Sequence, residues 1–396
     1  MNLQFSIINF VSVVLTLALS PRLSAGVPRP MAGANRSERI PPQDALLNLK
    51  AIPFKIVYET YRTAPDPDSG ASHPLLEGGR SAPAGPERQD EEGGGNWELY
   101  IINADGSDPI NLTNTPDVDE MYPHVSPDGA KICFVTDEGT EGRKVRNVCY
   151  MNIDGTERVK VARNAREPCW SFDGKSIAYL KGEYDRYTTR EYATSELIIY
   201  DLETGVHRPH PNKELHHLYA ICWSPCGRWF AAAVHGGMGY SDTILAFEAQ
   251  GTRVFDLGRW GVKGCRPDFS SDGTKMTWGE TDWNLYVGDV DLTGYEPKVT
   301  NIHEVIRCSR RFKVYHVDFS PDARYIAFSY GPFSGGQQVG GMARGWNICV
   351  SDLSAGNDRQ RIYGKVTADG NHNKEPDWVP AVRTRDETAT VKPPNN

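Results

Sequence analysis

Five copies of one short pattern constrain the fold of this chain more than any other feature of its sequence. Each copy has an aromatic or apolar residue, then Ser, any residue, and an Asp-Gly turn or a variant of it, followed by a short run of alternating apolar residues. The serines of the five copies are Ser126, Ser171, Ser224, Ser270 and Ser320. A truncated sixth copy covers residues 377–380. Self-similarity at a period of roughly 45 to 55 residues is typical of propellers and other repeat folds.

Each copy has the composition of two strands joined by a tight turn. Pro presets φ, Asp bonds its own backbone and Gly accepts a positive φ, which is the chemistry of a turn. The apolar residues beyond the turn alternate, as they do in a strand with one buried face. A second hairpin follows within each repeat, for example at residues 98–113, 147–162 and 284–300. Four short antiparallel strands per repeat predict one blade of a β-propeller.

These turns resemble those of the TolB-like, WD40-like (PD40) β-propeller repeat family. The resemblance extends from residue 53 to residue 380. It implies an all-β propeller that recognises a protein or a carbohydrate, without identifying either ligand. TolB itself carries an α/β domain before its propeller. Residues 26–52 are Pro-rich, polar and too few for such a domain, so we expect a linker there.

The two ends of the repeat region predict how the ring of blades closes. Ile52 to Arg62 matches the second strand of a repeat but lacks the first, and residues 377–380 match a first strand without its successor. If both strands share one blade, the closed ring has no open sheet edge. This count gives six blades of four antiparallel strands. A seventh blade within residues 62–96 is the alternative, which the Gly, Pro and charge content of that segment disfavours.

The sequence outside the repeats predicts an exported protein. Phe5 to Ser20 is one apolar run and Leu23-Ser24-Ala25 is an acceptable cleavage site, so residues 1–25 are predicted to be a secretory signal peptide. An uncleaved membrane anchor is the alternative, although the run is shorter than the roughly 20 residues that span a bilayer. We therefore expect a periplasmic or secreted protein with no integral membrane segment after cleavage. The polar residues 381–396 predict a disordered tail.

Composition limits the classes of ligand and cofactor. With 396 residues, 39% hydrophobic content and a formal net charge of −8, the chain can bury a large core and offers no Lys/Arg-dense face to a nucleic acid. We expect a monomer. The eight cysteines contain no Cys-x-x-Cys pair, so neither a metal nor another cofactor is expected. Most cysteines fall in predicted strands and are expected to be buried thiols, but a disulfide between Cys133 and Cys149, on adjacent strands, is left open.

The innermost strand of each blade supplies the candidate ligand-binding residues. Side chains alternate between the two faces of a strand. The residues one and three positions before the repeated aromatic or apolar position therefore share a side, while those between are mostly Pro or apolar. Seven polar residues of these sets are predicted to bind a ligand at the channel mouth: His124, Glu167, Arg266, Asp268, His316, Asp318 and Glu375. The alternative is a solvated channel in which these mixed charges only satisfy one another.

Three long segments join the second and third strands of their blades and are expected on one face of the ring. They are residues 62–96, 182–196 and 330–346. The first and third come from neighbouring blades, and the second is rich in Tyr and Arg, which suits a binding surface. We predict that this face carries the binding site. Solvated insertions, which loops tolerate at little cost, are the alternative.

Propeller enzymes are the alternative to a binding module. A peptidase of the prolyl oligopeptidase type needs a Gly-x-Ser-x-Gly elbow and a separate hydrolase domain, and the sequence offers neither. An enzyme similar to oligogalacturonate lyase would hold a metal through histidines, although two adjacent histidines rarely share one metal. The histidines available for that role are His216, His217, His316 and His372.

A glycosidase would instead pair two carboxylates across a sugar bond. Glu167 with Glu375, or Asp268 with Asp318, are the pairs that the repeat alignment offers. A propeller channel commonly contains carboxylates, so this signal has little specificity. The sequence therefore favours a binding or interaction module for a protein or carbohydrate ligand, with no catalytic residue assigned.

Overall fold

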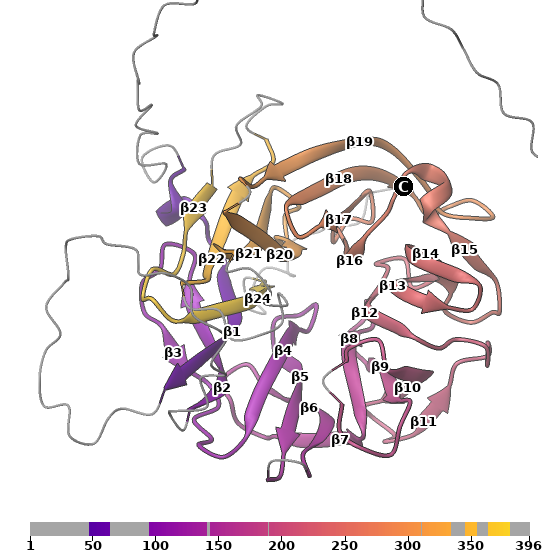
Figure 1. Cartoon of the computed structure of the whole chain (residues 1–396), viewed down its shortest axis with the longest axis horizontal. Coiled ribbons are helices and arrows are strands. Elements are labelled where there is room, and N and C mark those ends of the chain that lie inside the picture. The colour runs from indigo at the N-terminus through magenta and orange to yellow at the C-terminus, as the bar shows by residue number, and fades with distance from the viewer. Residues whose placement is uncertain are drawn as a thin grey trace, which may run out of the picture. The chain divides into compact units, whose positions relative to one another are not determined.

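The structure is a computed structural model, and it describes residues 47–63, 95–140, 143–188, 190–309, 311–333, 345–354 and 363–380. These residues form six four-stranded antiparallel sheets arranged around a central axis, as Figure 1 shows. The predicted all-β, six-bladed propeller is confirmed. Two short 3-10 helices, Leu49–Ala51 and Leu257–Trp260, are the only helices among the residues described.

Blade 1 consists of β24, β1, β2 and β3 from the channel outward, and blades 2 to 6 each take four strands that are consecutive in sequence. The strands of blades 1 to 3 are β24 (His372–Val379), β1 (Lys55–Thr63), β2 (Gly95–Asn103), β3 (Ile110–Asn111), β4 (Asp119–Val125), β5 (Lys131–Glu138), β6 (Val145–Asn152), β7 (Val159–Arg163), β8 (Ala165–Trp170), β9 (Ser176–Gly182), β10 (Thr194–Asp201) and β11 (His207–Pro209). The strands of blades 4 to 6 are β12 (Leu218–Trp223), β13 (Trp229–Gly237), β14 (Tyr240–Glu248), β15 (Val254–Asp256), β16 (Cys265–Phe269), β17 (Lys275–Thr281), β18 (Asn284–Asp291), β19 (Lys298–Arg307), β20 (Phe312–Phe319), β21 (Tyr325–Pro332), β22 (Asn347–Asp352) and β23 (Tyr363–Lys365).

The ring closes through a blade built from both ends of the described chain, as predicted. β24 pairs antiparallel with β1, with Val379 opposite Lys55 and His372 opposite Tyr61. β1 in turn pairs with β2 along its whole length. In Figure 1 the yellow β24 lies beside the indigo β1. The shared blade removes the two sheet edges that an open ring would expose.

The serine and aspartate of the repeat hold the turn between the first two strands of blades 2, 3, 5 and 6. In blade 2, the backbone N–H of Lys131 donates to Ser126 Oγ at 2.9 Å, and Ser126 Oγ donates to Asp128 Oδ1 at 2.6 Å. Gly129 follows with a φ of +72°, a conformation that glycine adopts without steric cost. In blade 4 the aspartate position is occupied by Cys226. The repeated Ser-x-Asp pattern is therefore a turn-forming device.

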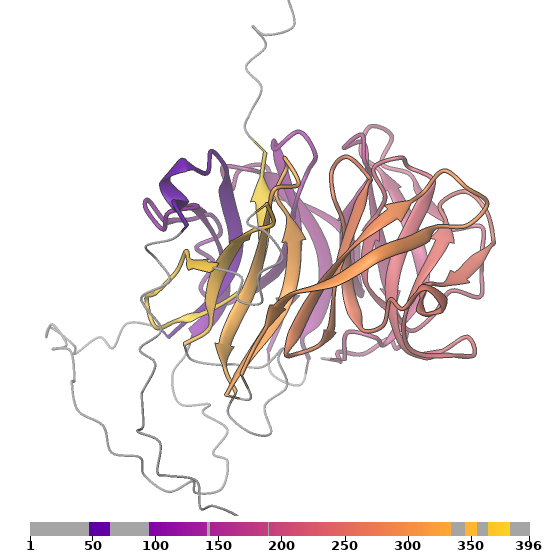
Figure 2. The ribbon, with the colours of Figure 1, turned by 90° about the horizontal axis from the view of Figure 1, so that it is seen from above.

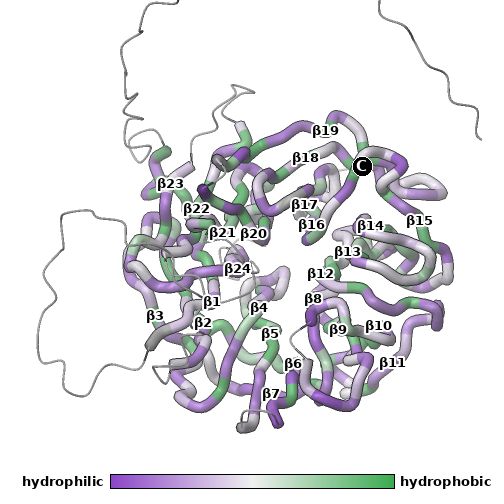
Figure 3. Tube along the Cα trace, viewed as in Figure 1, coloured by the Kyte–Doolittle hydropathy of each residue, from purple (hydrophilic) through white to green (hydrophobic). Residues whose placement is uncertain are grey.

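The core consists of six clusters of buried apolar side chains, each centred on the interface between two adjacent blades. The interface of blades 3 and 4, for example, buries Leu180 and Phe230 completely or nearly so. Hydrophobic residues accordingly occur in every blade, as Figure 3 shows. Trp170 of blade 3 adds a polar tie, because its indole N–H donates to the carbonyl oxygen of His124 in blade 2 at 2.8 Å.

A β-bulge interrupts the innermost strand of every blade. The register between the first two strands shifts at an equivalent place in all six blades. One residue of each bulge has a left-handed backbone, with φ between 47° and 54°: Tyr122, Glu167, Ala220, Arg266, His316 and Glu375. Each of these non-glycine residues costs on the order of 1 kcal/mol of backbone strain. Bulges re-aim side chains beside functional sites, and here they face the central channel.

The disulfide between Cys133 and Cys149 that the sequence left open does not form, and all eight cysteines are free thiols. In the ladder of β5 and β6, Cys149 lies opposite Phe134, whereas Cys133 lies opposite Tyr150. Successive residues of a strand point to opposite faces of the sheet. The two thiols therefore belong to different blade interfaces, Cys133 to that of blades 2 and 3 and Cys149 to that of blades 1 and 2.

Some predictions fall on residues outside those described: the signal peptide (1–25), most of the linker (26–46), most of the loops 62–96 and 330–346, and the tail (381–396). The end of the predicted linker is described. It includes the helix Leu49–Ala51, and Leu49 packs against blades 6 and 1. In the described part of the chain, no helix is both long and apolar enough to cross a membrane.

Candidate functional site

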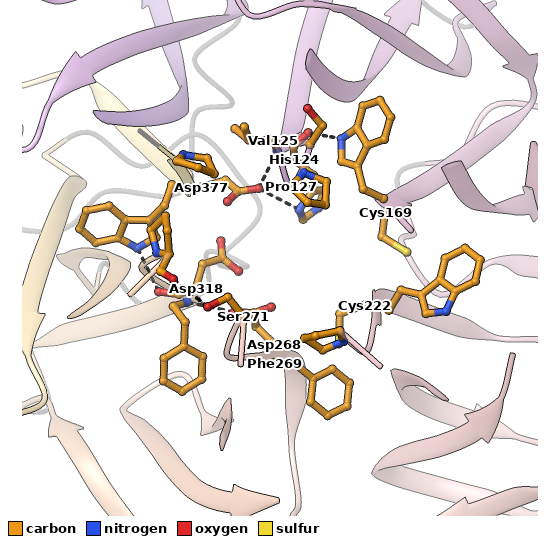
Figure 4. Close-up of a pocket in the computed structure, with 18 of the residues that line it drawn as sticks. His124, Val125, Pro127, Cys169, Cys222, Asp268, Phe269, Ser271, Asp318 and Asp377 are labelled. Atoms are coloured by element: carbon orange, nitrogen blue, oxygen red, sulfur yellow. Dashed lines mark hydrogen bonds and ion pairs between the residues drawn. The ribbon is translucent and has the colours of Figure 1, made fainter. Parts of the chain in front are cut away.

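A cavity of about 1170 Å³ occupies the central channel, lined by the innermost strands of all six blades and the turns that follow them. Figure 4 looks into this cavity and shows acidic side chains, imidazoles and thiols around the opening. All seven residues singled out from the sequence lie in the lining: His124, Glu167, Arg266, Asp268, His316, Asp318 and Glu375. They share this location because they occupy equivalent positions of the repeat. Ligand binding by them stays a prediction.

The cavity reaches the face of the Ser-x-Asp turns, whereas ligand binding on the face of the three long loops stays a prediction. The lining includes turn residues such as Pro127, Phe172 and Pro321. The second and third strands of a blade are joined at the ends opposite these turns, and Figure 2 shows the propeller in side view. None of the described residues of those three long loops lines the cavity. Binding by these loops, two of which lie largely outside the described residues, stays a prediction.

Glu191 of the loop between β9 and β10 reaches the channel residues at the end away from the Ser-x-Asp turns. Its carboxylate accepts hydrogen bonds from Tyr122 Oη at 2.9 Å, Arg266 Nη2 at 2.8 Å and Tyr315 Oη at 3.2 Å. These partners come from blades 2, 5 and 6. The guanidinium of Arg266 also stacks on the ring of Tyr315, 4.0 Å from its centroid. Glu191 therefore links three blades across the channel, and a ligand-binding role of its loop stays a prediction.

A chain of buried ion pairs continues from Glu191. Arg266 Nη1 lies 3.5 Å from Glu375 Oε2, and the same oxygen lies 2.6 Å from His316 Nδ1. Burial alone would raise the pKa of Glu375, but Arg266 and His316 outweigh it and lower that pKa to about 2. Burial likewise opposes a charged His316, but Asp318 and Glu375 raise its pKa well above the ordinary value. We call Glu191, Arg266, His316 and Glu375 the floor of the cavity.

Asp268, Asp318 and Asp377 form what we call the wall. Asp268 and Asp377 each accept a backbone N–H of the next blade, at 2.9 and 2.8 Å, and Asp318 accepts from His316 Nε2 at 2.7 Å. Backbone N–H groups fix a carboxylate but bring no positive charge. Burial, reinforced by the Asp318 carboxylate, raises the pKa of Asp268 well above its usual value. Burial raises the pKa of Asp377 as well, against an opposing hydrogen bond from His124.

Three exposed turn aspartates, Asp128, Asp173 and Asp322, form the rim. Each uses Oδ1 to hold its own turn. Within the described residues, the second oxygen of each has no hydrogen bond or ion pair. Phe172 stands beside Asp173 where the turns of blades 2 and 6 have proline, and it is 51% exposed. The mouth therefore combines free acidic groups with one exposed aromatic ring.

The described lining is strongly acidic. Its carboxylates are Asp128, Glu167, Asp173, Asp268, Asp318, Asp322, Glu375 and Asp377. Against these eight stand one arginine, Arg266, and two histidines, His124 and His316. The net charge is negative even when both imidazoles are protonated. Glu375 Oε1, which is buried, has no hydrogen-bond partner among the residues described. A cleft lined by one sign of charge concentrates counter-ions, so this cavity favours a cation.

The sequence did not identify several of these groups as site residues. Asp377 occupies the same repeat position as Asp268 and Asp318, so the repeat alignment contained the signal for it. The rim aspartates are explained by turn chemistry alone, and nothing in their pattern indicates a second role. Glu191 lies outside the aligned positions of the repeat, and no sequence signal places it in the channel.

The histidines of the lyase-like alternative are not brought together. His316 lies in the cavity, whereas His217 pairs with Glu183 at 3.2 Å and the ring of His372 packs on Tyr61 at 5.7 Å. Across the described ranges, no three His, Cys, Asp or Glu side chains are grouped so that they could hold a metal ion.

The carboxylates of the glycosidase-like alternative have structural partners. Glu167 Oε2 accepts the N–H of Ala220 in the next blade at 2.6 Å. Glu375 pairs with the floor cations, and Asp268 and Asp318 have the partners given above. These contacts account for the positions of all four groups without a reaction.

Comparisons with known proteins identify the fold. No family model and no curated protein matches the chain. Among solved structures, TolB from Acinetobacter baumannii is similar at 18% identity and a TM-score of 0.54, over 83% of this chain and 67% of that one. An oligogalacturonate lyase in complex with manganese matches at 12% identity and a TM-score of 0.42, over 68% of this chain and 70% of that one. The second likeness is too low to bear on the site. The first confirms the TolB-like propeller fold.

Proposed function

We propose that this protein is an exported binding module that takes a positively charged segment of a protein partner into the central cavity. The observation that supports the proposal is the charge of the described lining, eight carboxylates against one arginine and two histidines. The ligand would enter from the face of the Ser-x-Asp turns, because these turns line the cavity. Binding would bring positive charge to the wall, in which Asp268 has no cationic partner among the residues described.

The negative charge of the lining also discriminates between protein and carbohydrate, the two ligand classes that the repeat family suggests. Lys or Arg side chains would form charge-assisted hydrogen bonds with the wall, which are stronger than neutral ones. A polyuronate would be repelled, because like charges brought together across an interface cost several kcal/mol. A neutral sugar would gain little from the excess charge. A cationic protein segment therefore fits the cavity better than either carbohydrate.

A second, smaller groove supports a polypeptide ligand. It has a volume of about 310 Å³, lies between blades 3 and 4, and is lined in part by Pro209 and Pro211. Phe172 and Trp223 line both this groove and the cavity. The two hollows thus adjoin at these two aromatic residues. Exposed aromatic side chains are frequent anchors of protein interfaces, so a ligand with one cationic and one apolar side chain would use both.

Export is part of the proposal and rests on the apolar run of residues 5–20. We expect the mature protein, purified from the periplasm or the medium, to begin at Gly26. N-terminal sequencing checks this. A mature protein that retains residues 1–25 would contradict cleavage of a signal peptide.

Fluorescence anisotropy with a fluorescein-labelled tetra-arginine peptide tests the binding site. Asp268→Asn is expected to weaken binding about tenfold or more, because a hydrogen bond to a charged group contributes about 1.5–3 kcal/mol. The asparagine still accepts the backbone N–H, so the fold is preserved. Asp185→Asn removes the same charge from an exposed position on the opposite face and is the matched control. Equal affinity of these two variants would contradict the proposed site.

A further inference from the structure

We propose that the chain's own segment 381–396 docks its first arginines in the cavity mouth and competes with the external ligand, an inference that rests on the proposed function. Pro380 is the last described residue, and it belongs to the cavity lining. Its carbonyl oxygen lies 3.0 Å from the position that a Cβ on Gly129 would take. The chain therefore leaves the described structure at the cavity wall, against the turn of blade 2.

Two carboxylates flank this exit. Asp128 directly precedes Gly129 in the turn that Pro380 contacts, and Asp377 stands three residues before Pro380 in β24. Asp128 is exposed, and only its Oδ1 accepts hydrogen bonds within its turn. Asp377 belongs to the wall, where its carboxylate accepts the N–H of Val125 and lies 3.5 Å from His124 Nδ1. A cationic residue that follows Pro380 closely in the chain is therefore near two carboxylates.

Arg383 and Arg385 are such cations. The segment reads AVRTRDETATVKPPNN. An extended chain spans at most about 3.5 Å per residue, so the two arginine Cα atoms lie within about 10 and 17 Å of Pro380. A guanidinium binds a carboxylate through two parallel hydrogen bonds. Asp386 and Glu387, which follow, would be repelled by the rim, and this limits the docked part to the first five residues.

The other end of the described chain leaves from a different place. Leu49 packs against Gly364 of β23, where an added Cβ would lie 2.9 Å from Leu49 Cδ1. β23 is the outermost strand of blade 6. The residues before Leu47 therefore start from the outer edge of the propeller. Of the two terminal segments, only 381–396 begins in the lining of the cavity.

Tethering makes even a weak contact effective. A short flexible tether holds its segment at an effective concentration on the order of 1 mM. If the free segment binds with a Kd of about 0.1–0.3 mM, the tethered one lowers the affinity for an external ligand about 4- to 10-fold. The cavity would then select ligands that bind more tightly than the chain's own arginines.

Titration of the fluorescein-labelled tetra-arginine peptide against full-length proteins tests this inference. The double variant R383Q/R385Q is expected to bind the probe about 4- to 10-fold more tightly than the wild type. K392Q removes a positive charge farther along the same segment and is expected to behave like the wild type. A synthetic peptide of residues 381–396 is expected to displace the probe from the double variant.

The remaining outcomes separate this inference from the proposed function. Equal affinity of the wild type and R383Q/R385Q, with Asp268→Asn weakening both, would overturn the docking of the segment and leave the proposed function intact. Absence of probe binding by R383Q/R385Q would overturn both. If the gain in probe affinity of R383Q/R385Q over the wild type increases with protein concentration, the segment docks in a second copy. This outcome would overturn docking within one chain.

Discussion

The floor and the wall of the cavity are built from equivalent strands, yet they balance charge in different ways. In the floor, Arg266 and His316 each lie within 3.5 Å of a carboxylate, and Glu375 contacts both cations. In the wall, Asp268 is held by a backbone N–H and has no cationic partner among the residues described, whereas Asp377 and Asp318 each also contact an imidazole. The floor is therefore a structural network that ties blades together, whereas the wall keeps negative charge that a ligand could neutralise.

This difference separates stability from binding. Removing one member of a buried ion pair leaves an uncompensated charge and is strongly destabilising. Removing a carboxylate that lacks a cation relieves repulsion instead, and functional sites commonly carry such a cost in stability. Substitutions in the floor should therefore act on folding, and substitutions in the wall on ligand affinity.

The largest effect is expected from Arg266→Met, which keeps the approximate side-chain volume but removes the charge. Glu191 and Glu375 then lose their shared partner, and the free energy of unfolding is expected to fall by about 3–5 kcal/mol. Urea unfolding at pH 7 measures this, with Asp185→Asn as a variant expected to be neutral. A loss below about 1 kcal/mol would show that the floor network does not stabilise the propeller.

The second largest effect is expected from Glu375, which makes the stability of the fold depend on pH. Its pKa is about 2, below the ordinary 4.5, so its contribution is present above pH 4.5 and is lost as the pH falls toward 2. Because His316 and Arg266 remain charged over this range, Glu375→Gln is expected to cost about 2–3 kcal/mol at pH 7. Unfolding curves from pH 7 to pH 2 should show the wild type and the variant converging. A constant difference would contradict the pairing.

Asp268→Asn is expected to change the free energy of unfolding in the opposite direction. The raised pKa of Asp268 means that stability is present below its ordinary pKa of 3.8 and is lost as the pH rises through the folded value. The variant is therefore expected to be more stable than the wild type at pH 8, by up to about 1 kcal/mol, and equal near pH 4. Thermal unfolding at both pH values measures this. If the variant is less stable than the wild type at pH 8, Asp268 stabilises the fold as the floor residues do, which would contradict its assignment to the wall.

Glu191→Gln is expected to have only a small effect on folding and none on ligand affinity. Glutamine still accepts hydrogen bonds from the two tyrosines, so the loss of charge beside Arg266 should cost about 1 kcal/mol. Because Glu191 lies at the end away from the cavity mouth, affinity for the tetra-arginine peptide should remain unchanged. A loss of affinity as large as that of Asp268→Asn would show that the two ends of the channel are coupled.

The fold followed from the repeat because each part of the pattern has a local cause. Ser126 and Asp128 hold a turn by hydrogen bonds within a few residues, and the same chemistry recurs along the chain. Pairing of residues 377–380 with the first strand followed from the two incomplete repeats. The channel position of Glu375 followed from the alignment of the innermost strands.

The site was only partly predictable, because its decisive features are not local. Glu191 enters the channel through contacts with three other blades, which no pattern within its own loop records. The contrast between Asp268 and Glu375 depends on which cation lies across the channel, and this emerges only when the six blades surround one axis.

Co-crystallisation of the R383Q/R385Q variant with the tetra-arginine peptide tests whether the wall binds a cation. The expected structure has a guanidinium group about 2.7–2.9 Å from a carboxylate oxygen of Asp268, Asp318 or Asp377, with the floor ion pairs intact. A peptide bound on the face that carries the β9–β10 loop, or one that breaks the pair of Arg266 with Glu191, would contradict it.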